Sequence, residues 1–363
     1  MKLSGVARLL TSRPSMHVSR LHRILPLPLF GAYNSTMAAI EDLIYGRAVA
    51  ETRIEQPPLF VLGYWRSGTT LLQTLLAHDR NFQYLNLYQA LFPWHFLLTE
   101  KVTTKLTARF VPKARPMDNM QVSWDSPQED DMASCVMSGI SPCSVVSHPH
   151  DYRHFWKALS FDTLSETELN RWKSCFLTLL KKLTYRSNKR VLLKSPYHTF
   201  HIPTLLEMFP EAKFVYIHRH PYHVFRSACH LRHRMIAENT LGRDLFINTE
   251  EEVIRSYRRG FELYERDRLL IPDGNLCEVS FEQLECDPLS ELERVYASLN
   301  LPGFDDVAES VTRELPSLQR YRKNKFPNDP EWAAVVYEQL RDAFERFCYE
   351  APETSDLHAM PAA

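Results

Sequence analysis

The sequence predicts an α/β protein with a P-loop-like, three-layer fold, in which helices cover both faces of a central parallel sheet. Short β-rich apolar runs recur along the chain, and each is followed by a polar turn and a segment with helical periodicity. This alternation is typical of parallel sheets, since parallel neighbouring strands need a long crossover connection, usually a helix. The first apolar run also leads into a loop that resembles a phosphate-binding loop.

The expected elements can be placed in chain order. The apolar runs predict strands at residues 59–62, 191–193, 213–218 and 276–280. Helical periodicity predicts helices at residues 69–77, 167–185, 202–209, 221–235, 250–268 and 281–299. The aromatic and proline-rich stretch from about residue 88 to 150 has one short helical segment, near residues 130–138. We expect this insertion to cover the sheet and to form the acceptor pocket.

Length and charge favour an enzyme-sized single domain. The 363 residues contain no internal repeat or Gly/Ser linker, so we expect one catalytic domain over residues 51–350, between an arm at 1–50 and a tail at 351–363. The net charge of −1 argues against a nonspecific nucleic-acid binder and requires any anion site to be local.

The cysteines and the apolar stretches indicate in which cellular compartment the protein is expected. The seven cysteines are scattered and form no C-x-x-C pair, which predicts reduced thiols and a cytoplasmic protein. The apolar stretches fall short of the roughly 20 residues that a membrane-spanning helix needs. We therefore expect no transmembrane span.

The N-terminal arm leaves two alternatives open. Residues 1–40 contain no Asp or Glu but five Lys or Arg side chains among Ser, Leu and Val, a composition that suits an organelle transit peptide. Alternatively, the arm and its apolar segment 24–30 lie on the protein body or make a peripheral contact with a membrane surface.

The stretch FVLGYWRSGTT, residues 60–70, has the glycine spacing of the phosphate loop G-x-x-x-x-G-K-[ST], but Thr69 replaces its lysine. Gly68 allows a close approach of the backbone, and Ser67, Thr69 and Thr70 add hydroxyl donors at a helix N-terminus. The loop is therefore predicted to hold an anion.

Arg66 supplies the charge that the missing lysine would bring. A guanidinium can clamp a phosphate bidentately without a metal, whereas the lysine of a nucleotide kinase works beside a magnesium ion held by a carboxylate. No apolar strand ending in Asp stands out in the sequence. An ordinary strand-to-helix turn is the alternative.

A second anion-binding segment is KFVYIHRHPYHVFRSACHL, residues 213–231. A strand again ends in a basic residue, Arg219, and Ser227 follows in the next helix, which Pro221 opens. Two strand ends with arginine and hydroxyl donors predict a ligand with two separated phosphates, which is not the profile of ATP.

At these residues the chain resembles the sulfotransferases that use 3′-phosphoadenosine 5′-phosphosulfate (PAPS), in particular the broad group related to tyrosylprotein sulfotransferases and many bacterial and algal enzymes. The resemblance is clear over residues 57–231 and looser over 276–288. It implies that the R-S-G-T-T loop holds the 5′-phosphosulfate, that Arg219 and Ser227 grip the 3′-phosphate, and that Lys194 in RVLLKSPYHTF lies beside the transferred sulfonate. It also implies a metal-independent reaction with PAPS as donor.

Two departures from that family concern the acceptor. The tyrosylprotein enzymes have a catalytic Glu near positions 84–86, where this chain has no acid, which argues against protein tyrosine as the acceptor. Close relatives instead carry a P-x-E-D-[ED] element, found here at residues 127–131, and a His that is Tyr64 in this chain. We expect a hydroxyl or amine of a small-molecule, lipid or carbohydrate acceptor.

The predicted site has several candidates for the catalytic base. Glu129 and Asp130 come first, ahead of Asp131, because adjacent carboxylates raise one another's pKa; a helix cap or a solvated face is the alternative. His198 is the competitor, since it follows Lys194 closely. The histidine clusters lack the residues that would complete a metal site, so no metal is expected.

Two further segments have open roles. The rings of residues 88–96, with Trp124, line either an acceptor pocket or the core, and the basic residues 320–326 either close over the donor or lie on the surface. The competing functions are a P-loop kinase, which the absent lysine opposes, and a non-catalytic nucleotide-binding protein, which intact Arg66 and Lys194 oppose.

Overall fold

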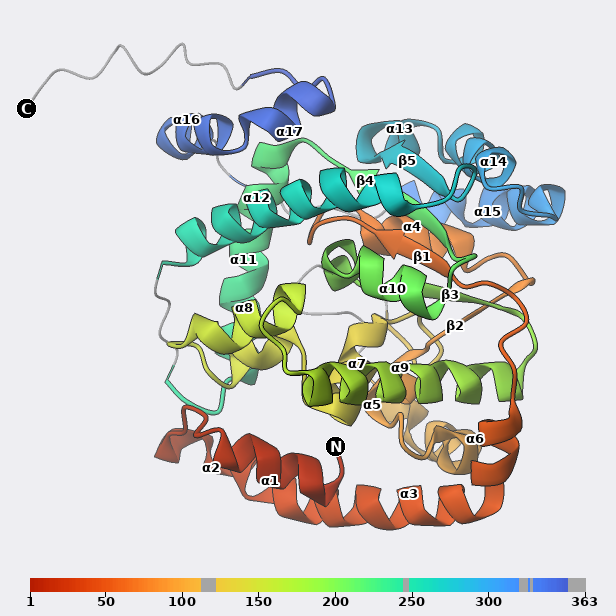
Figure 1. Ribbon diagram of the computed structural model, residues 1–363, viewed down its shortest axis with the longest axis vertical. Helices are drawn as coiled ribbons and strands as arrows, with labels where there is room; N and C mark the ends of the chain where they lie inside the picture. Colours follow the sequence, from red (N-terminus) through yellow and green to blue (C-terminus); the bar gives the residue numbers. More distant parts are fainter. Residues whose placement is uncertain (112–121, 244–247, 320–325, 327–328, 352–363) are drawn as a thin grey trace, which may run out of the picture.

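The computed structural model describes residues 1–111, 122–243, 248–319, 326 and 329–351, and it contains a central parallel sheet between layers of helices (Figure 1). The strand order is β2-β3-β1-β4-β5 and every neighbouring pair is parallel. The strands are β1 (Leu59–Leu62), β2 (Phe82–Tyr84), β3 (Arg190–Lys194), β4 (Lys213–His218) and β5 (Leu276–Ser280). The four predicted strands are confirmed, and the short edge strand β2 was missed.

Successive strand residues point to opposite faces of the sheet and define its two helical layers. Phe60 and Leu62 share a buried cluster with apolar side chains of α9 (Glu166–Arg186) and α10 (Ile202–Met208). Leu59 and Val61 instead join a cluster on the opposite face, with side chains from α4 (Thr69–Leu76), α14 (Pro288–Ser298) and α15 (Phe304–Gln319). The predicted three-layer α/β fold is confirmed.

The predicted helices are all present, with one change. The segment 281–299 divides into α13 (Phe281–Cys286) and α14, because Pro288 begins a new helix that Asp287 caps. The remaining helices of the described C-terminal half are α11 (Pro221–Asn239), α12 (Thr249–Asp267), α16 (Pro330–Gln339) and α17 (Arg341–Arg346). Residues 320–325 and 352–363 lie outside the described residues, so the predicted basic loop and the tail are not characterised.

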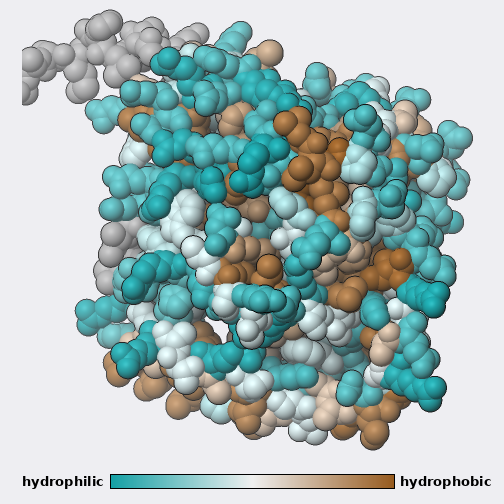
Figure 2. Space-filling model, viewed as in Figure 1, coloured by the Kyte–Doolittle hydropathy of each residue, from teal (hydrophilic) through white to brown (hydrophobic). Residues whose placement is uncertain are grey.

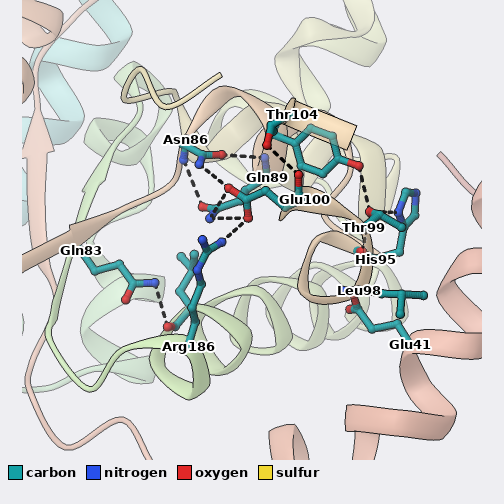
Figure 3. A network of polar contacts seen from close by, with 12 residues as sticks. Glu41, Gln83, Asn86, Gln89, His95, Leu98, Thr99, Glu100, Thr104 and Arg186 are labelled. Carbon is teal, nitrogen blue, oxygen red and sulfur yellow. Dashed lines mark hydrogen bonds and ion pairs between the residues drawn. The ribbon is translucent and has the colours of Figure 1, made fainter. Parts of the chain in front are cut away.

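The insertion packs on the α9 side of the sheet, as a set of short helices. Its helices are α5 (Leu87–Leu91), α6 (Phe96–Thr107) and α7 (Asp130–Ser138), followed by α8 (Tyr152–Ser160). A polar network holds it in place (Figure 3): Glu100 of α6 accepts hydrogen bonds from Asn86 and Gln89 and pairs with Arg186 of α9. Asn86 also caps α5 together with Gln89.

The N-terminal arm is helical and lies against this insertion. It consists of α1 (Leu3–Thr11), α2 (Leu21–Ile24) and α3 (Pro26–Glu51), which line the lower edge of the molecule in Figure 1. Glu41 of α3 forms a buried ion pair with Lys182 of α9 at 2.5 Å and accepts a hydrogen bond from the Leu98 amide. Asn34 bonds His95. No helix in the described part of the chain is long and apolar enough to cross a membrane.

Candidate active site

The loop between β1 and α4 depends on its two glycines. Both have positive φ, +143° at Gly63 and +107° at Gly68. A Cβ on Gly63 would lie 2.5 Å from the carbonyl oxygen of Ile217, and one on Gly68 would lie 2.3 Å from the ring of Phe281. The Gly63 amide donates to Thr199 Oγ1 at 2.9 Å. The loop is therefore fixed against β4 and α13 in a conformation that only glycine allows at these positions.

The loop ends at the N-terminus of α4, where backbone N–H groups and a partial positive charge face the space beyond the strand end. No acidic residue lies in the first turn, and the N-cap residue, Gly68, has no side chain that could cap it. The hydroxyl of Ser67 is buried and makes no hydrogen bond to any described residue. An uncapped helix N-terminus beside an unsatisfied buried hydroxyl fits an anionic ligand.

The two predicted phosphate-binding segments meet in space. Arg66 Nε donates to Ser227 Oγ of α11 at 2.9 Å, and the Arg219 guanidinium donates to the Arg66 carbonyl at 3.3 Å. Arg219 lies over the ring of Phe281, 4.2 Å from its centroid, and burial lowers the pKa of its guanidinium below the usual value. A single ligand could therefore contact both segments.

Lys194 joins the loop to the insertion. It ends β3, its side chain is 2 % exposed, and its ammonium donates to Glu129 Oε1 at 2.8 Å and to Thr70 Oγ1 at 3.5 Å. Glu129 is the N-cap residue of α7, and its side chain is 36 % exposed. The structure thus brings a lysine from the sheet and a carboxylate from the insertion to the edge of the anion-binding loop.

The two other acids of the cluster point away from this edge. Asp130 Oδ2 lies 2.7 Å from His198 Nε2, although the two groups do not form a well-aligned hydrogen bond. Both side chains are buried, and the His198 ring packs edge-on against Phe60. Asp131 accepts a hydrogen bond from Ser141 at 2.6 Å, and burial raises its pKa to about 8. Only Glu129 is both next to Lys194 and accessible.

The aromatic residues that the sequence singled out belong largely to the core. Tyr88 and Phe96 are 1 % exposed and pack beneath the insertion, so for these two the core alternative is the correct one. The ring nearest the loop is instead Trp65, which lies within the motif itself. Its centroid is 4.7 Å from that of Tyr197 and 6.4 Å from that of Phe155. Trp65 is partly exposed, whereas Tyr197 and Phe155 are buried and support its ring from the core. Trp65 was not among the predicted site residues, although its position between Gly63 and Gly68 was a signal.

Tyr64 and His218 have structural partners. The Tyr64 hydroxyl donates to the Val253 carbonyl or to Ser256 Oγ, so it faces α12 rather than the loop. His218 bonds the Tyr349 hydroxyl at 2.8 Å. Within the described ranges, no group of three or more His, Cys, Asp or Glu side chains is arranged to hold a metal ion.

Comparisons with known proteins agree with this geometry. Residues 57–306 match the model of the sulfotransferase family. The omega-hydroxy-beta-dihydromenaquinone-9 sulfotransferases Stf3 of Mycobacterium bovis and Mycobacterium tuberculosis are each 32 % identical over 354 residues, covering 98 % of this chain and 91 % of the relative.

Among solved structures, two mycobacterial sulfotransferases share the fold. Sulfotransferase STF9 from Mycobacterium avium has a TM-score of 0.72 at 18 % identity, covering 95 % of this chain and 90 % of that one. STF1 from Mycobacterium tuberculosis has a TM-score of 0.64 at 17 % identity, covering 93 % and 90 %. The family match spans both strand-end motifs and the acidic element of the insertion, and this chain is an enzyme of the sulfotransferase family.

Proposed function

We propose that this enzyme transfers a sulfonate group from PAPS to a hydroxyl group of a lipid acceptor. The observation that carries the proposal is the convergence of three strand ends. Arg66 after β1 bonds Ser227 beyond β4, and Lys194 at the end of β3 lies between Thr70 and Glu129. Cationic side chains that follow or end three strands thus lie close to one accessible carboxylate, that of Glu129.

The two motif segments suit a nucleotide with separated phosphates. Arg66, Ser67, Gly68, Thr69 and Thr70 would hold the 5′-phosphosulfate at the N-terminus of α4. Arg219 and Ser227 would hold the 3′-phosphate, and the Arg66–Ser227 hydrogen bond sets the two groups of donors at a fixed separation. These positive groups supply within the protein the charge stabilisation that kinases obtain in part from magnesium.

Glu129 is proposed as the base. The donor supplies a sulfonate whose bond to the bridging phosphate oxygen breaks as the bond from sulfur to the acceptor oxygen forms. Glu129 accepts the acceptor's hydroxyl proton, while Lys194 and Arg66 stabilise the charge that develops on the leaving phosphate oxygen. Asp130 and His198 are buried behind Glu129 and would hold the start of α7 in place.

A lipid acceptor is favoured by two observations. The curated relatives are sulfotransferases of omega-hydroxy-beta-dihydromenaquinone-9, according to their names. In this chain Trp65, a partly exposed ring within the loop motif, offers an apolar contact to a hydrocarbon chain that carries a hydroxyl group, and the buried rings of Tyr197 and Phe155 support it from the core. We place the enzyme on the cytoplasmic side, where PAPS would be available to it.

The test is product formation from isotopically labelled PAPS in the presence of EDTA. Acceptors would include a hydroxylated prenyl quinone, a simple phenol and a hexose, with mass spectrometry recording the gain of one sulfonate. We expect product from the lipid and loss of product in Glu129→Gln and Lys194→Met. Transfer only to the hexose or phenol would contradict the lipid assignment. Donor binding without any product would favour a non-catalytic protein, and magnesium-dependent phosphorylation from ATP would favour a kinase.

A further inference from the structure

Helix α3 exposes its large apolar side chains to solvent. Leu25, just before the helix, is 69 % exposed, and Leu29, Phe30, Leu43 and Ile44 are 74 %, 60 %, 87 % and 55 % exposed. Their spacing of three or four residues, or multiples of these, places most of them along one side of the helix. With Tyr33 and Ile40, which are also exposed, these residues are called the α3 apolar face.

The opposite side of α3 is buried against the protein body, and two polar side chains lie there among Gly31, Ala38 and Val49. Asn34 and Glu41 are buried and bonded to His95, the Leu98 amide and Lys182. Rolling the helix inward would bury the apolar face but would break this ion pair and these hydrogen bonds. The orientation is therefore fixed by the buried contacts, and the apolar face is held outward.

Figure 2 shows hydrophobic residues along the lower edge of the molecule, where α2 and α3 lie in Figure 1. This edge is unusual for the chain, because 12 of the 22 exposed large hydrophobic residues in the described part fall within residues 1–44. An apolar row of about 20 residues on a helix is about 30 Å long. A contiguous row of this kind marks an interaction surface rather than scattered surface residues.

The charges around this face are mainly positive. Residues 1–40 contain no acidic side chain, and Arg8 and Arg13 of the arm are exposed. Helix α6, which contacts α3, and the turn after it add the exposed cations Lys101, Lys105 and Arg109 and the exposed apolar residues Val102, Leu106 and Phe110. Helix α3 itself exposes two acids, Asp42 and Glu51, and Glu51 pairs with Arg47.

We propose that the α3 apolar face docks this enzyme on the surface of an anionic lipid bilayer, with α3 lying in the plane of the interface. Apolar side chains flanked by cations are the pattern of helices that bind in this way. A second copy of the chain is a poorer occupant, since its own arginines and lysines would face those of the first. Docking depends on the arm and α6 and does not rest on the identity of the acceptor.

The test is flotation of the full chain with vesicles, without donor or acceptor. Vesicles of phosphatidylcholine alone would be compared with vesicles that also contain phosphatidylglycerol. We expect the wild type to bind the anionic vesicles. The Leu29→Ser/Leu43→Ser variant should lose at least about tenfold in its partitioning onto these vesicles. The Arg8→Ala/Arg13→Ala variant should show a smaller loss, and only on anionic vesicles. The matched control is Leu269→Ser/Leu270→Ser, two exposed leucines of the 3-10 turn Arg268–Leu270, which should bind like the wild type.

Three results would overturn the inference. One is unchanged binding by Leu29→Ser/Leu43→Ser, and another is an equal loss in the control variant. The third is a concentration-dependent dimer, seen by light scattering, that this variant abolishes while the wild type fails to bind vesicles. Sulfonate transfer to a detergent-dispersed acceptor, measured in parallel, separates a failure of docking from a failure of the proposed reaction.

Discussion

The proposed donor half and the proposed acceptor half of the site are held in place by different kinds of interaction. The donor half, the loop after β1 with the β4–α11 connection, is fixed by backbone: Gly63 and Gly68 leave no room for a side chain between neighbouring elements. The proposed acceptor half, which consists of the insertion and the N-terminal arm, is fixed by polar pairs in which at least the carboxylate is buried, as in Lys182–Glu41 and Arg186–Glu100. The Lys194–Glu129 contact joins the two halves.

Because the two halves are held in place separately, nucleotide binding and sulfonate transfer should respond to different mutations. A change in the donor half should alter nucleotide affinity, and a change at Glu129 should alter turnover alone. A change in the polar network of the acceptor half should alter stability. The following predictions test that division, starting with the largest expected effect.

Removing the charge of Glu129 should have the greatest consequence. We expect Glu129→Gln to lower kcat by about 10²–10⁴-fold, the usual contribution of a general base, while the affinity for 3′,5′-adenosine bisphosphate changes by less than about threefold. Steady-state kinetics and calorimetry measure the two quantities. Glu207→Gln is the control, because Glu207 also pairs with a lysine, Lys173 at 2.6 Å, and its side chain is 67 % exposed. Wild-type turnover in Glu129→Gln would remove this residue from the mechanism.

Breaking the buried ion pair between arm and body should destabilise the acceptor half. In Lys182→Met the carboxylate of Glu41 stays buried without its partner, which costs about 3–5 kcal/mol of unfolding free energy. Lys181→Met is the matched control and should cost about 1 kcal/mol, because Lys181 is partly exposed and donates to the Ala50 carbonyl rather than to a buried carboxylate. Denaturant titration of both variants makes the comparison. Equal losses would show that the ion pair is not what secures α3.

Removing one phosphate contact should weaken binding and leave the rest of the reaction intact. We expect Arg219→Ala to raise the Kd of 3′,5′-adenosine bisphosphate about 10–100-fold, the loss of charge-assisted hydrogen bonds to one phosphate. Arg234 lies on the exposed side of α11, the helix that follows Arg219, and pairs there with Glu238, so Arg234→Ala should leave the Kd unchanged. If Arg219→Ala binds like the wild type, the second motif does not hold the 3′-phosphate.

A smaller, pH-dependent effect is expected at Asp131. Burial raises the pKa of this carboxyl to about 8 from an ordinary value of 3.8, so the folded state favours the neutral form. The unfolded state therefore releases this proton first, and the contribution of Asp131 to stability falls as pH rises from about 4 to about 8. Asp131→Asn should be close to the wild type at pH 4 and more stable at pH 8 in denaturant titrations. A difference that does not grow with pH would contradict this assignment.

The positions of the loop after β1 and of the β4–α11 connection at strand ends could be predicted from the sequence, because each is a contiguous segment. Arg66 and Ser227 were assigned to one ligand before their 2.9 Å contact was known. The Lys194–Glu129 contact was beyond prediction, since it joins residues 65 positions apart through packing of the insertion. Both residues were candidates, but their pairing depends on how α7 meets β3.

The acceptor half was harder to predict for physical reasons. Strand β2 has only three residues with Gln83 at its centre, so it lacks an apolar run. Helix α3 was not assigned because its apolar side chains face outward and its buried positions include Asn34 and Glu41, which reverses the usual pattern. Tertiary contacts with His95 and Lys182, which no local pattern encodes, set this orientation.

The central claim is that two strand-end motifs form one site for a nucleotide with two separated phosphates. Calorimetry in the presence of EDTA tests it most directly, with 3′,5′-adenosine bisphosphate compared with 5′-AMP, which lacks the 3′-phosphate. The account predicts that the bisphosphate binds at least about 10-fold more tightly than 5′-AMP, and that Arg219→Ala removes most of this difference. Equal affinity for the two nucleotides, or tighter binding of ATP with magnesium, would contradict it.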